Sequence, residues 1–307
     1  MSTSTPPVVE IPATVATDSR GSRAALARRR LTSLPASIVA LVLAVLWTIP
    51  TAGLLVTSFR PQLDIGRSGW WTVFTDPEFT LDNYHEALTS GSNNLGQYFV
   101  NSIVITLPAV VLPILIASLA SYAFAWMKWR GRDTLFVVVF ALQIVPLQVT
   151  LIPLLTMYQK NLHIAGTYWS VWISHTIFAL PLAIFLLHNF MRELPEELIE
   201  AARVDGAGHV RIFFQVLLPL ITPALAAFGI FQFLWVWNDL LVSLTFLGGT
   251  PEVAPLTVRV AELSGTRGNA WYLLSAGAFI SMIVPMLVFL SLQRYFVRGL
   301  LAGGLKG

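Results

Sequence analysis

The chain has 307 residues, of which 55% are hydrophobic and only 11% are charged. A soluble domain of ordinary composition carries about 25% charged residues, so there is too little charge here to cover a water-facing surface. The chain contains no cysteine, which excludes disulfides, thiolate metal sites and a cysteine nucleophile. The composition therefore indicates a protein that lies in a lipid bilayer.

Residues 1–34 are rich in Ser, Thr, Pro, Ala and Arg and have no apolar periodicity, which predicts a disordered basic tail. Three arginines, Arg28 to Arg30, precede the first apolar run, Ala36 to Thr57. This run is longer than the core of a signal peptide, which spans about 7–15 residues. We therefore expect an uncleaved first helix, and a long leader that is later removed is the alternative.

Six stretches reach the roughly 20 apolar residues that a membrane helix needs. They are residues 35–58, 97–126, 134–157, 168–190, 212–237 and 272–296. Apolar character continues from Trp237 to Leu247, which is too long for one crossing. The fifth helix is therefore expected to end near Trp237 and to be followed by a short segment closed by Gly248 and Gly249. The fold class predicted is an all-α membrane protein with six transmembrane helices in one domain, residues 35–307.

The basic residues fix the predicted orientation. With the N-terminus inside, fourteen of the 19 basic residues fall on the cytoplasmic side and five on the outer side. This asymmetry agrees with the positive-inside rule and makes both termini cytoplasmic. Loops 60–96 and 248–271 are then external and loop 191–211 is internal. Besides Pro35 at the boundary of the first span, nine prolines, Pro146 among them, fall within the predicted spans, and each tends to kink its helix.

The internal loop contains one short predicted helix that follows Leu194. Pro195 suits a first helical turn, and Glu196 and Glu197 suit the positive end of the helix dipole. Gly206 suits the left-handed residue that ends a helix. The helix is expected to have roughly 11 residues and a length of about 16 Å.

Helical spacing places Leu198, Ala201, Ala202 and Asp205 on one face of this helix. The two alanines make that face thin, so it could enter a groove on a partner protein. A solvated connector helix is the alternative that spacing leaves open.

The same loop resembles a known motif. Glu200-Ala201-Ala202, followed by Gly206, Val216 and Leu218-Pro219, resembles the EAA motif of ABC importer permeases. The sequence has Val216 where that family commonly has isoleucine. Further likenesses to the family are Asn83-Tyr84, Phe99 to Ser102 and Trp237-Asn238-Asp239. The end of the chain, Gln293 to Leu300 and Gly303 to Gly307, resembles the second permease subunit of maltose-type carbohydrate importers.

The resemblance implies a type I ABC importer permease fold in a bacterial inner membrane. It also implies that the loop helix is a coupling helix that docks on a cytoplasmic ATPase through Glu200, Ala201, Ala202, Asp205 and Gly206. The expected partners are a second, different permease, two copies of the ATPase and an external solute-binding protein. The chain has no phosphate-binding loop, so ATP and magnesium belong to the ATPase and no catalytic residue is expected here.

By the same resemblance, Arg298, Gly303 and Lys306 of the C-terminal tail are expected to contact the ATPase. A solvated basic end that helps to fix topology is the alternative.

For the solute pathway the candidates are Gln232, Asn238 and Asp239, the last being the single acidic residue of the run 212–247. Asp239 could instead lie hydrated or as a helix cap at the membrane interface, which is the reading we favour. Other polar residues of the spans are Gln143, Gln148, His175, His188 and Asn189, and none of them has metal-ligand spacing that supports a site.

Three rival functions follow from the same residues. A secondary transporter would need ion-coupling acids within the spans, and only Asp239 approaches that. An intramembrane enzyme would need a nucleophile, a metal cluster or an acid–base pair, and none is evident. An ABC importer of a non-sugar solute is a closer alternative, although a phosphate-bearing solute would favour Lys or Arg within the spans, whose interiors contain neither.

Overall fold

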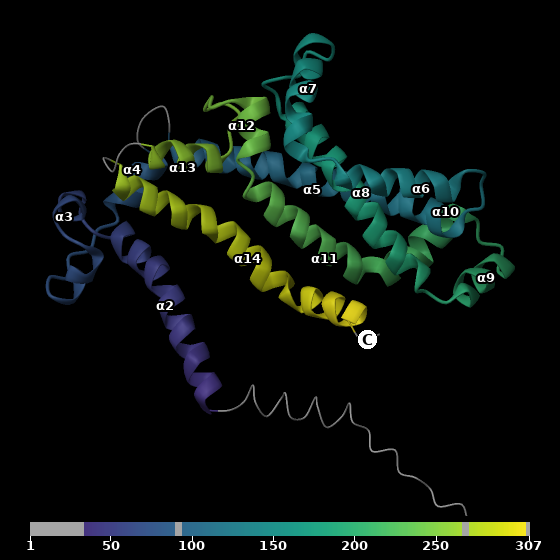
Figure 1. Cartoon of the computed structure of the whole chain (residues 1–307), viewed down its shortest axis with the longest axis horizontal. Helices are drawn as coiled ribbons and strands as arrows, with labels where there is room; N and C mark the ends of the chain where they lie inside the picture. The colour runs from purple at the N-terminus through teal and green to yellow at the C-terminus, as the bar shows by residue number, and fades with distance from the viewer. Residues whose placement is uncertain (1–33, 90–93, 266–269, 305–307) are drawn as a thin grey trace, which may run out of the picture. The chain divides into compact units, whose positions relative to one another are not determined.

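The computed structural model describes residues 34–89, 94–265 and 270–304, with side chains described as far as Gln293. The predicted tail, residues 1–34, therefore lies almost wholly outside the described residues. The chain divides into two compact units, residues 1–54 and residues 55–307. All helices from α3 onward belong to the second unit (Figure 1).

Every regular element in the described part of the chain is helical. The elements are α2 (Leu34–Ser58), α3 (Gln62–Arg67), η1 (Trp70–Phe74), α4 (Asp82–Thr89), α5 (Leu95–Trp126), α6 (Arg132–Ala141), η2 (Leu142–Ile144), α7 (Leu147–Lys160), α8 (Tyr168–Arg192), α9 (Glu196–Val204), α10 (His209–Arg211), the π-helical η3 (Ile212–Leu217), α11 (Leu218–Trp237), α12 (Leu241–Leu247), α13 (Leu256–Ser264) and α14 (Trp271–Gly304).

The six predicted spans correspond to helices long and apolar enough to cross a membrane. Five are continuous, and the third is the bent pair α6–η2 and α7. The prediction that the fifth helix ends near Trp237 is confirmed, because α11 ends there and the short α12 follows. Gly248 closes α12 with a φ of 72°, a left-handed backbone that favours glycine.

The third span differs from its prediction as one continuous helix, residues 134–157. Residues Arg132–Ile144 and Leu147–Lys160 meet at an angle of 100°. The cause is Pro146, which has no N–H to donate to the preceding turn and forces the residue before it out of the α region. Val145 accordingly has extended backbone, with φ −69° and ψ 120°. Figure 1 shows α7 turning away from the line of α6.

The centre of the second unit is a close pair of helices, α5 and α8, with α11 against both. Small side chains face one another in this contact: Ala117 of α5 and Ala183 of α8 are fully buried. Small residues allow helix backbones to approach closely in a membrane. Two polar links add to the packing, since Ser121 Oγ donates to the Ile184 carbonyl (3.0 Å) and Gln232 Nε2 donates to the Ala109 carbonyl (3.0 Å).

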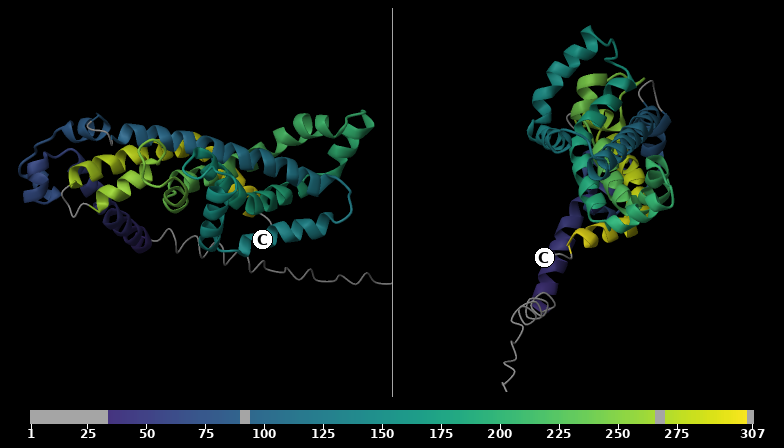
Figure 2. Two further views of the ribbon diagram at one scale, coloured as in Figure 1. Left: turned by 90° about the horizontal axis from the view of Figure 1, so that it is seen from above. Right: turned by 90° about the vertical axis from the view of Figure 1, so that its right-hand side faces the viewer.

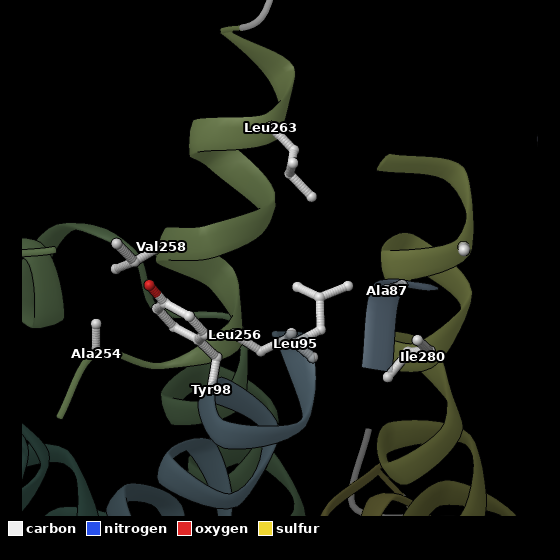
Figure 3. Close-up of a cluster of buried hydrophobic side chains, with 9 residues drawn as sticks. Ala87, Leu95, Tyr98, Ala254, Leu256, Val258, Leu263 and Ile280 are labelled. Carbon is white, nitrogen blue, oxygen red and sulfur yellow. The ribbon is translucent and has the colours of Figure 1, made fainter. Parts of the chain in front are cut away.

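At one end of the unit, α4, α13 and α14 close over the start of α5. Figure 3 shows Leu95 and Tyr98 of α5 beside Leu256 and Val258 in a buried cluster that also includes Ile280 of α14. We call this the α13 end of the bundle. The loop helix α9 lies at the opposite end (Figures 1 and 2).

The buried Asn101 fastens the α12–α13 loop to α5. Its Nδ2 donates to the carbonyls of Pro251 and Ala254, each at 2.9 Å, and its Oδ1 accepts from the Tyr168 hydroxyl at 2.9 Å. Beside it, Ser102 Oγ accepts from the Leu256 N–H at 2.8 Å. Both residues belong to the motif Phe99 to Ser102, so this motif holds the α12–α13 loop against α5.

Asn83 fastens the first loop in a similar way. Its Nδ2 donates to the carbonyls of Ser58 (3.0 Å) and Arg60 (2.8 Å), while Tyr84 shares a hydrogen bond with Ser58 Oγ (2.7 Å). Arg60 itself is only 5% exposed. Its guanidinium donates to the carbonyls of Asp64 and Ser68 and to the hydroxyls of Ser68 and Thr72, which organises residues 60–72 into one folded loop.

We expect Asn101→Ala to destabilise the protein, because it removes the amide that donates to the carbonyls of Pro251 and Ala254. Each buried polar group left without a partner costs roughly 1–3 kcal/mol. Thermal unfolding in detergent, followed by size-exclusion chromatography of the heated sample, measures the change. Asn161→Ala is the matched control, since Asn161 is an exposed asparagine at the end of α7. Equal unfolding temperatures for the two variants would contradict this account of the loop.

Candidate functional site

Helix α9 is closed at its C-terminal end by a Schellman motif. Gly206 has a φ of 78°, the N–H of Gly206 donates to the Arg203 carbonyl (3.0 Å), and the N–H of Ala207 donates to the Ala202 carbonyl (2.9 Å). This pair of bonds requires a left-handed residue at position 206, where a side chain is strained. The expected role of Gly206 as the helix terminator is confirmed. The helix has nine residues rather than eleven, with Pro195 at its N-cap.

One face of α9 is anchored in the bundle. Ile199 is 1% exposed and packs in a cluster with Tyr122 of α5, Met191 of α8 and Ile212 of η3. Ala202, three residues further on, is half-buried in the same cluster. Sequence reasoning missed Ile199, although an isoleucine three positions before an alanine has the spacing of an inward apolar stripe.

The other face of α9 points to solvent. Leu198 is 43% exposed and Val204 is 87% exposed, and Ala201 and Asp205 are also exposed. Glu200 is exposed as well. Of the four residues predicted to share one face, Leu198, Ala201 and Asp205 are exposed, while Ala202 is partly buried against the cluster of Ile199. Their role in docking stays a prediction. The outward surface of Leu198, Glu200, Ala201, Val204 and Asp205 is named the α9 ridge below.

Polar contacts tie the region around α9 to the end of α5. The Tyr122 hydroxyl and His209 Nδ1 lie 2.8 Å apart, and the Tyr122 ring is tilted against Phe213 with centroids 5.5 Å apart. Arg203 Nη2 donates to the Trp126 carbonyl at 3.5 Å. A force on α9 would therefore reach α5 directly.

A π-helical segment, η3, leads from α10 into α11. Pro219 follows it and has no N–H for the carbonyl of the preceding turn, which favours a wider hydrogen-bond register there. Short π segments within α-helices occur frequently at functional sites. The positions Val216 and Leu218-Pro219 of the motif thus mark an irregular joint between α9 and the fifth span.

Asp239 is a buried helix cap rather than a hydrated group. Its Oδ1 accepts from the Val242 N–H (3.1 Å), and its Oδ2 accepts from the Ser243 N–H and hydroxyl, each at 2.8 Å. The side chain is 7% exposed. Asn238 is also used locally, because its Nδ2 donates to the Leu234 carbonyl (2.8 Å). The carboxylate of Asp239 is therefore committed to starting α12.

His175 of α8 stands beside this cap. Its Nε2 lies 3.6 Å from Asp239 Oδ2, and its side chain is completely buried. Within the described part of the chain neither ring nitrogen has a hydrogen-bond partner. Burial by itself would raise the pKa of Asp239, but the nearby His175 and the hydrogen bonds from Ser243 outweigh it, so this pKa lies below its ordinary value. The carboxylate thus caps α12 and lies against His175 of α8.

Two adjoining cavities, each of about 460 Å³, open beside α8 and α11. Gln143, Phe178 and Trp235 line both of them. Gln232 lines the second cavity, and it is the one pathway candidate of the three predicted that reaches either of them. Among the described residues, no group of three or more His, Asp or Glu side chains could hold a metal ion.

Three further predicted residues have no described side-chain environment. Arg298 and Gly303 belong to α14, beyond the last residue with a described side chain, and Lys306 lies outside the described residues. The contact of this tail with an ATPase stays a prediction.

Five continuous apolar helices and one bent pair, with the capped helix α9 between the fourth and fifth spans, define a multi-pass membrane protein. The chain belongs to the family of binding-protein-dependent transport system inner membrane components, whose model matches residues 109–301. It is an integral protein of a bacterial inner membrane.

Relatives of known description support the same family. The chain is 54% identical to the osmoprotective compounds uptake permease protein GgtD of Synechocystis, over 89% of this chain and 92% of that protein. It is 50% identical to the alpha-glucoside transport system permease protein AglG of Rhizobium meliloti, over 82% and 67% of the two chains. It is 33% identical to the melibiose/raffinose/stachyose import permease protein MelC of Bacillus subtilis, over 88% and 96%.

The fold matches a solved transporter. A chain of a bacterial ABC transporter that imports the acidic polysaccharide alginate superposes with a TM-score of 0.68 at 21% identity, covering 86% of this chain and 98% of that chain. The prediction of an ABC importer permease fold is confirmed by this likeness and by the family.

Ile199 and Leu198 are neighbours with opposite environments, which allows a matched test. We expect Ile199→Ala to destabilise the protein by about 2–5 kcal/mol, because it empties a buried position. Leu198→Ala removes an exposed side chain and should leave unfolding unchanged. Thermal unfolding of both variants in detergent measures the difference. A stable Ile199→Ala would mean that α9 is not anchored through this residue.

Proposed function

We propose that this chain forms one half of the translocation pathway of an ATP-driven importer of neutral sugars, and that α9 couples it to a cytoplasmic ATPase. The observation that carries the proposal is the construction of α9. It is fixed to the bundle on one face through Ile199, closed by Gly206, and leaves an apolar and acidic ridge exposed on the other.

The α9 ridge has the composition of a docking surface. Exposed aliphatic side chains at Leu198 and Val204 flank the small Ala201, and Glu200 and Asp205 supply charge at the edge. A helix with an apolar stripe and charged flanks fits a hydrophobic groove on a partner. No described residue of the chain covers this surface, and an ATPase subunit is its proposed occupant.

The proposed assembly has four kinds of component. This chain pairs with a second permease, two ATPase copies bind at the α9 end, and a solute-binding protein docks at the α13 end. The family description names binding-protein dependence, which supports the last component. ATP binding closes the ATPase pair and so biases the permeases between two access states. The α9 end and both termini are cytoplasmic in this proposal, as the distribution of basic residues favours.

The proposed solute is a neutral sugar or oligosaccharide. Relatives at 50% and 33% identity are described as carriers of alpha-glucosides and of melibiose, raffinose and stachyose. The interiors of the spans hold no Lys or Arg that would balance a phosphate. A charged solute is thereby disfavoured.

We expect Glu200→Ala and Gly206→Pro to weaken or abolish ATPase association while membrane insertion stays normal. Gly206→Pro cannot adopt the left-handed backbone that the Schellman motif needs, and Glu200→Ala removes a charge from the ridge. Affinity purification of the tagged chain from membranes, with quantification of the ATPase that accompanies it, measures the effect.

Glu193→Ala serves as the control, because Glu193 is an exposed acidic residue in the same loop but outside α9. If both ridge variants retain full ATPase association and uptake, the proposed coupling role is wrong. Purification of the unchanged chain without any ATPase under several gentle conditions would instead favour a transporter that works alone.

A further inference from the structure

We propose that the elbow between α6 and α7, together with Trp235, forms a sugar-binding wall of the solute pathway in this subunit. This inference rests on the proposed function and adds a place where the chain itself contacts the solute. The elbow comprises residues 142–146, and all five of them line the first of the two cavities beside α8 and α11.

The elbow exposes unpaired backbone near the middle of a membrane span. Pro146 has no N–H, and Val145 donates back only to the Leu142 carbonyl (3.1 Å). Within the described ranges, the carbonyls of Gln143, Ile144 and Val145 accept no backbone hydrogen bond. Unsatisfied carbonyls in contact with lipid are strongly unfavourable, so broken helices persist in membranes where the break lines a watery cavity or is buried in protein. Broken helices of this kind mark solute sites in other transporters.

The opposite wall of the cavities is aromatic. Trp235 is 40% exposed and lies between the two cavities, and Phe178 lines both. The completely buried His175 packs edge-on against the Trp235 indole, with ring centroids 5.7 Å apart. The indole is thus held from behind while part of its surface stays open. An aromatic face with this freedom can stack on the apolar face of a pyranose ring.

Polar groups stand where sugar hydroxyls would need them. The Gln143 side chain lines both cavities and is exposed, and Gln232 borders the second. With the free elbow carbonyls they offer donors and acceptors around an otherwise apolar space. Mostly apolar walls with a few placed polar groups are the usual composition of a small-molecule site of 300–1,000 Å³.

The uncharged lining of the two cavities indicates which class of solute they can bind. None of the described residues lining the two cavities is Asp, Glu, Lys or Arg. Asp239, which follows α11, already accepts hydrogen bonds from Val242 and Ser243. An ionised solute would lose its hydration here without gaining a partner, which is costly. The wall therefore suits a neutral glycoside and not an acidic sugar.

The lack of cysteine in this chain makes the elbow directly testable. In the assembled transporter, Gln143→Cys and Ile144→Cys should react with a membrane-impermeant cationic methanethiosulfonate, because the cavity holds water. Leu115→Cys is the control, since Leu115 is an exposed leucine of α5 that lines neither cavity. Reaction of the elbow cysteines and not of the control supports the proposal. Elbow cysteines as inert as the control would overturn it and would place lipid or the second permease over the elbow.

Measurements of sugar uptake distinguish a cavity that binds sugar from one that only holds water. With labelled trehalose, sucrose and maltose as solutes, Trp235→Ala should lower the maximal uptake rate about fivefold, the loss expected for roughly 1 kcal/mol of stacking. Trp235→Phe keeps an aromatic face and should restore most of the rate. Trp169→Ala is the control, because Trp169 is an exposed tryptophan of α8 outside both cavities.

ATPase association distinguishes this inference from the proposed function. Normal uptake by Trp235→Ala in a complex that contains the ATPase would overturn the sugar-binding wall and leave the importer intact. Loss of uptake that Trp235→Phe does not restore would also count against stacking. Failure of the unchanged complex to transport any of the three sugars would contradict the neutral sugar in both proposals, while thiol reactivity would still decide whether the elbow lines a watery path.

Discussion

Every backbone N–H and C=O in a bilayer has to find a partner within the protein, and this constraint governs the whole structure. It explains why every regular element of the described chain is helical, and why side chains fasten its irregular segments. Asn101 satisfies two carbonyls of the α12–α13 loop, Asn83 satisfies two at the end of α2, and Asp239 satisfies two N–H groups at the start of α12. At the elbow, residues 142–146, some backbone carbonyls have no such partner. This is why we propose a function for it.

Helix α5 connects the two ends of the unit. Asn101 near its start holds the α12–α13 loop, and Tyr122 near its other end contacts His209 and packs against the cluster of Ile199. The close contact with α8, through residues as small as Ala117 and Ala183, makes the pair move together. A displacement of α9 would reach the opposite end of the molecule through one continuous, stiffly packed helix.

The sequence predicted the number and type of spans, because long apolar runs can be read from local composition. The orientation that the basic residues favour stays a prediction. The sequence also predicted the role of Gly206, since only a left-handed residue closes a helix in that way. It did not locate the break at Pro146, because hydropathy continues across it and the other prolines of the predicted spans cause no such break in the described helices. The partial burial of Ala202 and the approach of His175 to Asp239 depend on contacts between helices that are far apart in the sequence. Patterns within one helix do not predict such contacts.

The loop built around Arg60 has a consequence in the proposed topology, in which it faces the outside of the cell. All four acceptors of its guanidinium are backbone carbonyls or hydroxyl groups, none of which gains or loses a proton in ordinary media. A guanidinium also keeps its charge under any such condition. Many folded loops depend on a carboxylate partner and loosen when acid protonates it. Residues 60–72 lack that weakness, so this segment should hold its shape when a bacterium acidifies its surroundings.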